Sequence, residues 1–496
     1  MVVRIKPSAL NSASDSWVKN SLVDYILDSV RGVNQAESCI FGSCSLQNFN
    51  VNNYVAPKSE VTFIRGKGIE WNLIEAACDI RFDFELKGTD AYVRGNASIQ
   101  LYGISLATEL ALCRGNDGRL LISVTKSSAK VLVLDSDVRP TIIHKDGNSD
   151  TIGSSLREKL HGYLKVRMNE TRISTAMLNL AGHVARAIPD SVYQLNMELS
   201  SRAGFFLDDT LVKEPTLETD YIEVAFRAEF RMVGDEEGAS IQPHDLDLPP
   251  SHSSMIGIYI SDYVINTLCE VLFKKHLLSV NITKDLWFMS IYSYYRDLFD
   301  TSCENEFCFK NIFPNIAEKY PNAFAKFAFR ITSPPLASFS RGAGFSQGEL
   351  ELSILIPGVD GSEVTVTILP LSYSKSAALT FHTFKGNRVV GIVTDTKQTF
   401  TDRGSPEEFA SFVPRLNLVM KTITESILLP WSNIIGAIGF PLTQPNCGIR
   451  MFNTDIGFNP GVFRFSTDVA YDPTTSAENY DYFRTYSSYL YLLFPH

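Results

Sequence analysis

The most regular pattern in the sequence is the alternation of polar and apolar residues over residues 79–87. The apolar positions are Ile80, Phe82, Phe84 and Leu86. A period of two residues predicts a β-strand with one buried face. Similar runs, separated by turns rich in Gly and Asp, predict further strands over residues 97–105, 120–134, 326–332, 349–356, 363–369 and 388–395. Strands of this length with short turns between them predict antiparallel meanders.

Four longer segments repeat apolar residues at steps of three and four, which predicts amphipathic helices. They cover residues 8–30, 151–188, 261–278 and 406–438, and Ser261 is the expected N-cap of the third. Pro430 should end or kink the fourth helix. The apolar stripes include Leu10, Val18, Leu22, Ile26, Leu160, Leu164, Met168, Met177, Tyr263, Leu268, Leu272, Leu416, Val419, Met420, Ile423 and Ile427.

The clearest break in this pattern is the acidic and then Pro- and Ser-rich stretch of residues 234–254. Such a composition is typical of an extended, semi-rigid linker. It predicts two domains, residues 1–233 and 255–496. Each half shows the order helix, strands, long helix, strands, which a curled antiparallel sheet with a helix on its open side would satisfy. The pattern leaves open whether the helices pack directly on the sheets or leave an apolar gap for a lipid chain.

Composition narrows the function classes. The chain has 496 residues with 45% hydrophobic and 20% charged residues, so it can bury large cores. Its 45 Lys and Arg against 55 Asp and Glu give a net charge of −10, which argues against general nucleic-acid binding. No apolar stretch reaches the roughly 20 residues that a membrane span needs. The first residues also lack a secretory h-region, so the chain is either cytoplasmic or a processed form.

Two close cysteine pairs, Cys39 with Cys44 and Cys303 with Cys308, lie in short polar segments. Each pair is a candidate disulfide. Zinc binding and free thiols are the alternatives, and zinc is disfavoured because both spacings are C-x4-C with no His nearby. Three sequons make Asn96, Asn169 and Asn281 candidate glycosylation sites, a number near chance for this length.

One string resembles an enzyme motif. Residues 344–348 read G-F-S-Q-G and match the G-x-S-x-G of serine hydrolases, in which the serine sits on a turn from a strand into a helix. Here an alternating strand follows instead, so we expect Ser346 not to be a nucleophile. No metal-binding or nucleotide-binding motif occurs. We therefore predict no catalytic residues, no metal and no cofactor.

Several strings resemble the family of bactericidal/permeability-increasing protein (BPI) and lipopolysaccharide-binding protein (LBP), within the lipid-binding superfamily that includes PLTP and CETP. After the linker, residues 255–267 (MIGIYISDYVINT) resemble the segment that opens the family's C-terminal domain. The strings FPNIAEKYPN (313–322) with SPP (333–335), GFPL (439–442) and VFRFSTDV (462–469) follow in the family's order. Val2-Val-Arg-Ile5 resembles the family's mature N-terminus.

The resemblance implies an α+β fold of two tandem antiparallel β-barrels, closed by long amphipathic helices and joined by a central sheet into a boomerang. Each barrel would hold the acyl chains of a phospholipid-like ligand in an apolar pocket, and the helix stripes would line it. A phospholipid or other acyl lipid is the expected partner. The resemblance also implies a secreted monomer from which the signal peptide has been removed, with binding to a membrane or lipoprotein surface as a further expectation.

An alternative within the same family is an innate-immunity protein that binds lipopolysaccharide and acts against bacteria. Antibacterial members carry a basic tip on the first barrel. Residues 33–50 contain no Lys or Arg here, and the next tip segment, residues 87–94, has two cations and one acid. Without clustered cations, binding of an anionic endotoxin loses its Coulomb attraction. We therefore expect carriage of lipid rather than endotoxin killing.

Overall fold

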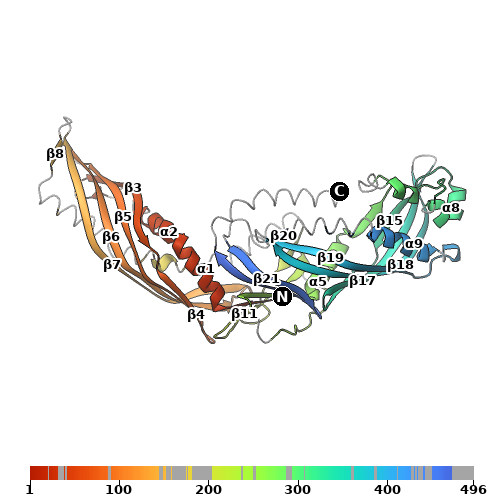
Figure 1. The fold of residues 1–496 in the computed structure, drawn as a ribbon, viewed down its shortest axis with the longest axis horizontal. Coiled ribbons are helices and arrows are strands. Elements are labelled where there is room, and N and C mark those ends of the chain that lie inside the picture. The colour runs from red at the N-terminus through yellow and green to blue at the C-terminus, as the bar shows by residue number, and fades with distance from the viewer. Residues whose placement is uncertain are drawn as a thin grey trace.

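The computed structural model describes residues 1–20, 22–31, 38–39, 42–87, 91–144, 149–151, 158, 175, 177–180, 182, 204–235, 238–249, 253–285, 293–305, 308–358, 362–384, 388–409, 412–425, 429, 433, 440–441 and 449–471. It is a mixed structure of helices and strands in which strands predominate. Two long antiparallel sheets lie at opposite ends of an elongated molecule, with a third sheet between them (Figure 1). We call the two ends the N-terminal and C-terminal lobes.

The N-terminal lobe is built on a seven-stranded sheet with the order β2-β3-β5-β6-β7-β8 and β4 paired to β5. Helices α1 (Pro7–Asn20) and α2 (Leu22–Arg31) lie along this sheet (Figure 1). The strands are β2 (Ser38–Cys39), β3 (Gly42–Val55), β4 (Lys58–Ile64), β5 (Gly68–Lys87), β6 (Ala91–Arg114), β7 (Leu120–His144) and β8 (Ser149–Thr151).

The C-terminal lobe repeats this order: β14-β15-β17-β18-β19-β20, with β16 paired to β17. Helix α9 (Phe412–Ile423) packs on β19. The strands are β14 (Ser279–Ile282), β15 (Lys326–Ile331), β16 (Leu336–Ser340), β17 (Ala343–Pro357), β18 (Glu363–Phe384), β19 (Arg388–Asp402) and β20 (Phe440–Pro441). Between β14 and β15 lie η2 (Ser293–Leu298), α7 (Phe309–Ile312) and α8 (Pro314–Lys319), and η3 (Glu407–Phe409) precedes α9.

The central sheet takes strands from distant parts of the chain, in the order β10-β11-β1-β13-β22-β21. Strand β1 pairs with β11 on one side and with β13 on the other. A two-stranded ribbon of β9 and β12 and helix α5 (Asp262–Lys274) lie beside it. The strands are β1 (Val2–Ile5), β9 (Phe205–Asp208), β10 (Thr216–Leu217), β11 (Ile222–Ala225), β12 (Glu229–Met232), β13 (Ile256–Ser261), β21 (Ile449–Asn459) and β22 (Val462–Tyr471).

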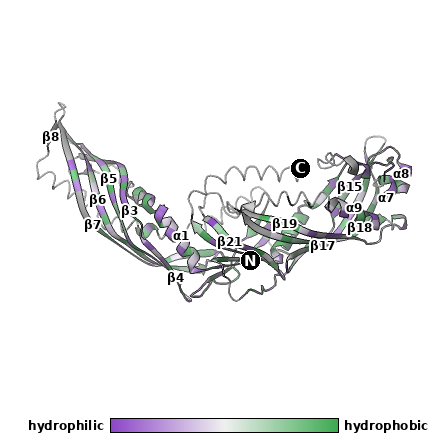
Figure 2. Cartoon of the chain, viewed as in Figure 1, coloured by the Kyte–Doolittle hydropathy of each residue, from purple (hydrophilic) through white to green (hydrophobic). Residues whose placement is uncertain are grey.

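The alternating runs are confirmed as strands, and the structure extends most of them. The predicted strand at 79–87 is the end of β5, and its apolar residues Ile80, Phe82 and Phe84 are buried. Polar and apolar residues form bands along the long strands (Figure 2). Shifts of register interrupt the alternation, for example between Gln100 and Leu101 in β6. Because each bulge resets the period of two, the sequence pattern shows only fragments of a long strand.

Helices lie in all four predicted segments, and the fourth contains α9 at Phe412–Ile423. The first contains α1 and α2, whose bounds match the predicted 8–30 closely, and the third ends at Lys274 rather than at residue 278. Ser261 is the N-cap of α5 as predicted, although its side chain makes no capping hydrogen bond. Residue 158 and several residues from 175 to 182 are helical, but most of the predicted helix at 151–188 lies outside the described residues.

Candidate functional site

Helix α9 and the C-terminal sheet enclose the clearest apolar interior. Phe412, Leu416 and Val413 of α9 are buried against Leu352 and Ile354 of β17. The amide of Asn417 fixes the helix to the sheet: its Nδ2 donates to the carbonyl of Phe400 at 2.8 Å, and its Oδ1 accepts from the Phe400 N–H at 2.7 Å. A single side chain thus satisfies both backbone groups of one β19 residue and sets the height of α9 above the sheet.

A small cavity of about 40 Å³ remains between α9 and the sheet. Its lining has no polar side chain and consists of Ile282, Leu298, Phe299, Ile312, Phe313, Phe327, Phe329, Leu352, Phe412, Leu416, Val419 and Met420. Three predicted pocket residues, Leu416, Val419 and Met420, therefore lie together on it. Ligand pockets usually measure about 300–1,000 Å³, so an acyl chain would have to displace side chains here. Met420 is suited to such movement because methionine is unbranched and adapts its shape.

In the N-terminal lobe, helices α1 and α2 cover an apolar core of the same kind. The predicted residues Val18, Leu22 and Met177 are almost fully buried in this core, and Leu10 packs against its edge. Asn11 of α1 fixes the helix to β4 as Asn417 does to β19. Its Nδ2 donates to the carbonyl of Val61 at 2.9 Å, and its Oδ1 accepts from the Val61 N–H at 2.6 Å.

Helix α5 is held in the same way. We call this arrangement, in which an asparagine side chain bonds both backbone groups of one strand residue, the asparagine clasp. Asn266 donates to the carbonyl of Ala337 in β16 at 3.0 Å and accepts from the Ala337 N–H at 2.6 Å. Asn266 is the fifth residue of α5 and Asn11 the fifth of α1. The sequence pattern did not single out these asparagines. An asparagine at the fifth position of both helices was the available signal.

The remaining predicted lining residues have other positions. Tyr263 is buried beside the central sheet, where its hydroxyl donates to Glu229 Oε2 at 3.0 Å. Leu268 and Leu272 are half-buried on α5. The structure gives only the backbone of Ile26 in α2 and Ile423 in α9. Leu160, Leu164, Met168 and Ile427 lie outside the described residues.

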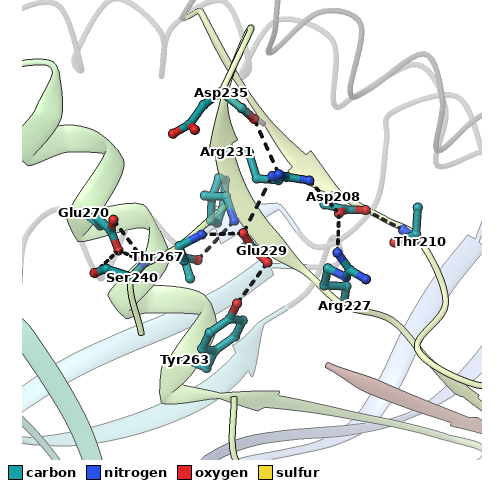
Figure 3. Close-up of polar contacts among 12 residues, drawn as sticks. Asp208, Thr210, Arg227, Glu229, Arg231, Asp235, Ser240, Tyr263, Thr267 and Glu270 are labelled. Atoms are coloured by element: carbon teal, nitrogen blue, oxygen red, sulfur yellow. Dashed lines mark hydrogen bonds and ion pairs between the residues drawn. The ribbon is translucent and has the colours of Figure 1, made fainter. Parts of the chain in front are cut away.

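The linker is fastened to α5 and β12 by buried charges, which Figure 3 shows. Glu229 Oε1 accepts from the Ala239 N–H at 2.8 Å, and Glu270 accepts from the Ser240 N–H and hydroxyl, each at 3.0 Å. Burial and the hydrogen bond to Glu229 raise the pKa of Tyr263, so its hydroxyl stays protonated. Every one of these carboxylates has a partner, so the network holds the linker rather than offering reactive groups.

The structure confirms one predicted disulfide, between Cys303 and Cys308. This pair therefore neither binds zinc nor remains reduced. Cys39 lies in β2 and Cys44 in β3. The structure describes their backbone but not their side chains, so this disulfide stays a prediction. Among the glycosylation candidates, Asn96 on β6 and Asn281 on β14 are exposed, whereas Asn169 lies outside the described residues.

Ser346 lies within β17, paired to both β16 and β18, rather than on a turn from a strand into a helix. Its hydroxyl contacts that of Tyr373 at 3.5 Å. Within the described ranges, no three His, Cys, Asp or Glu side chains gather as a metal site. No helix in the same ranges is long and apolar enough to span a membrane.

Comparison with known proteins decides the family. Residues 200–471 match the family model described as the LBP / BPI / CETP family, C-terminal domain. The chain belongs to this family. The matched segment holds the linker, α5, the whole C-terminal sheet and the last two strands of the central sheet, so the resemblance predicted from the sequence is confirmed.

Curated relatives agree with this assignment. Bovine lipopolysaccharide-binding protein is 24% identical over 359 residues, which cover 70% of this chain and 68% of the relative. The human lipopolysaccharide-binding protein is 21% identical and covers 69% of this chain and 67% of its own length. Bactericidal permeability-increasing protein of Sebastes schlegelii is 22% identical, and the match covers 83% of this chain and 82% of that protein.

A solved structure of lipopolysaccharide binding protein also aligns over 95% of this chain and 98% of its own, at 17% identity. The TM-score is 0.43, which is too low for the superposition to establish a shared architecture. The P47 protein of Clostridium botulinum A2 aligns with a TM-score of 0.21 at 11% identity, covering 94% of this chain and 96% of that chain.

Proposed function

We propose that this protein binds acyl lipids without catalysing a reaction, and that each lobe holds a phospholipid-like ligand between its helices and its sheet. The observation that carries the proposal is the purely apolar lining of the space between α9 and the C-terminal sheet. Such a lining offers acyl chains about 0.8 kcal/mol per buried CH₂ and contains no group that could attack an ester. The names of the lipopolysaccharide-binding relatives support a lipid ligand.

The finer features of the family belong to the same proposal. We propose that residues 1–233 and 255–496 are two tandem barrel domains, that residues 234–254 link them, and that together they form a boomerang. The remaining predicted stripe residues, except Tyr263, would line the pockets. Secretion as a monomer, glycosylation at Asn96 and Asn281 and a Cys39–Cys44 disulfide complete the proposal. The identical strand order of the two sheets supports the division into two domains.

Mass spectrometry of the protein purified without detergent tests the proposal. We expect a native mass that includes one or two phospholipids, and extraction with organic solvent should recover them. An apo mass, together with no uptake of a fluorescent phospholipid, would exclude the proposal.

A substitution in α9 tests whether one of the bound lipids lies in the C-terminal lobe. Met420→Trp fills the space between α9 and the sheet and should reduce the bound lipid by about one molecule, because overpacking leaves no room for the chain. Leu418→Trp is the matched control, since Leu418 lies on the same helix and is 63% exposed. Equal lipid content in both variants would place the ligand elsewhere.

The second candidate function is recognition of lipopolysaccharide, which the names of the relatives favour. The described cations near the first tip argue against strong binding. Lys87 and Arg94 both lie near Glu85, at 3.9 and 3.3 Å, which offsets part of their charge. Titration with lipid A at low salt tests this candidate, and the absence of binding there would exclude it, because low salt strengthens any Coulomb attraction.

A further inference from the structure

Helix α8 lies at the far end of the C-terminal lobe (Figure 1). Next to it is an open depression of about 640 Å³. Three lysines and two aromatic rings border it: Lys284, Lys319, Lys326, Tyr320 and Phe324. Phe324 is 38% exposed. Neither the predicted lipid pockets nor the central network includes any of these residues.

The exposed ring is held on a fixed turn. The Ala325 N–H donates to the carbonyl of Phe299 at 2.7 Å, and the Thr301 N–H donates to the carbonyl of Ala323 at 3.0 Å. The Asn322 N–H donates to Ser302 Oγ at 2.6 Å, and the Cys303–Cys308 disulfide follows directly after that serine. Phe324 is therefore presented by a braced segment, and its exposure does not result from a loose loop.

The three lysines around the depression differ in their partners. Lys326 pairs with Glu363 at 3.2 Å. The Lys284 ammonium lies 3.6 Å from the centroid of the Phe324 ring, and the Lys319 ammonium lies 5.4 Å from that of Tyr320. Within the part of the chain that the structure describes, neither of these two lysines forms an ion pair. Two cations thus stand over aromatic rings, and among the described lining residues Asp285 is the carboxylate without an ion-pair partner.

The geometry points to a membrane-docking site at this end: Lys284 and Lys319 bind the phosphates of anionic phospholipid headgroups while Phe324 enters the layer beneath them. A bilayer supplies both features at the right depth, because its headgroup plane lies directly above apolar chains. The net charge of −10 gives the whole molecule no general attraction to such a surface. Docking would therefore depend on this patch and orient the lobe end-on.

Sedimentation with vesicles tests the site. The full chain should bind phosphatidylcholine vesicles containing about 30 mol% phosphatidylserine more tightly than pure phosphatidylcholine, with binding that weakens as salt rises. The double variant Lys284→Gln/Lys319→Gln should reduce partitioning by about 30-fold, since each cation near the surface contributes about 1 kcal/mol. Phe324→Ser should reduce it by about tenfold, through loss of the buried ring.

Matched controls separate docking from general surface effects. Phe345→Ser removes a ring of similar exposure on β17, and Lys397→Gln removes an exposed lysine on β19. Both should bind like the parent protein, and Lys284→Arg should retain binding because the charge is kept. Equal binding to both kinds of vesicle, or equal losses in the control and site variants, would overturn the proposal.

Vesicle binding and the content of interior lipid are measured separately, so the docking site can fail without the proposed function failing. Lipid extracted from the site variants should equal that of the parent protein, and an unchanged melting temperature would show that they fold. Loss of vesicle binding with full lipid content supports the docking site. Full lipid content with no vesicle binding by the parent protein would refute the docking site alone.

Discussion

The two lobes share a strand order and a helix clasp, yet they fill their cores differently. In the N-terminal lobe the most buried residues are largely aliphatic, with Ile80, Ile99, Leu101, Ile104 and Leu106 nearly inaccessible. In the C-terminal lobe aliphatic residues share the core with a group of phenylalanines, in which Phe313 contacts Phe309, Phe327, Phe409 and Phe412 with ring centroids 4.2–6.4 Å apart. The same topology therefore tolerates either kind of filling, as long as the volume between helix and sheet is occupied.

The lobes also differ in what connects their first two strands. In the N-terminal lobe only residues 40–41 separate β2 from β3, whereas residues 283–325 separate β14 from β15. That longer connection contains η2, α7, α8 and the disulfide, and it forms most of the depression at the end of the lobe. The longer connection between β14 and β15 thus gives the C-terminal lobe a surface that the short connection between β2 and β3 does not provide.

The largest expected effect comes from Phe313→Ala. Removing this ring should cost about 3–5 kcal/mol, because the aromatic group around it cannot close the cavity. If the lobes are separate domains, calorimetry should show two transitions, and only that of the C-terminal lobe should move. Phe82→Ala should move only the other transition.

Phe345→Ala is the control for both substitutions, because its ring is 42% exposed and its loss should change stability by less than about 0.5 kcal/mol. A single transition that both core variants shift equally would show that the lobes unfold together.

A smaller and equal effect is expected from Asn11→Ala and Asn266→Ala. Each leaves one backbone N–H and one carbonyl without their side-chain partner, which should cost about 2 kcal/mol in urea unfolding. Hydrogen exchange at Val61 and Ala337 should accelerate in the corresponding variant. Asn20→Ala serves as the control because this exposed residue of α1 donates to Ser16 of its own helix. Very different losses in the two lobes would argue against equivalent roles for the clasps.

The smallest effect concerns the central sheet, which joins the lobes. Glu223 accepts from Arg4 Nε and Lys213 Nζ, both at 2.8 Å. Burial tends to raise the pKa of Glu223, but the hydrogen bonds from Lys213 and Arg4 outweigh it and lower the pKa overall. A lowered pKa means that this stabilisation is present at neutral pH and is lost as pH falls through the folded-state pKa.

Glu223→Gln should therefore cost about 1 kcal/mol at pH 7, since hydrogen bonds to a charged group are lost. The difference between parent and variant should shrink in acid, which unfolding measurements at neutral and strongly acid pH would reveal. A difference that stays constant over this range would mean that the charge of Glu223 contributes nothing.

The sequence predicted the positions of the long strands better than their lengths. Strand β18 runs from Glu363 to Phe384, although alternation predicted only 363–369. Pro370 lies inside it, and the register shifts between Ala378 and Leu379. Prolines and bulges break the period of two while the backbone continues to pair. A strand predicted from alternation therefore ends before the hydrogen-bonded pairing of the real strand does.

The candidate site was predictable in part, for a different reason. Helical spacing placed Leu416, Val419 and Met420 on one face of α9, and they do line one cavity. Tyr263 has the same spacing on α5, but it faces Glu229 because the two-stranded ribbon packs against that helix. Which element covers a helix face depends on contacts between distant residues, and local periodicity contains no information about them.

The position of β1 in the middle of the central sheet has a consequence for protein synthesis. Residues 2–5 pair with β11 and β13, and β13 pairs in turn with β22, which ends at residue 471. At about 5–20 residues per second, a ribosome needs roughly 25–90 s between making the first of these strands and the last. Strand β1 keeps an unpaired edge until β13 has been made, and the sheet around it is complete only after β22, so residues 2–5 reach their complete surroundings late in synthesis.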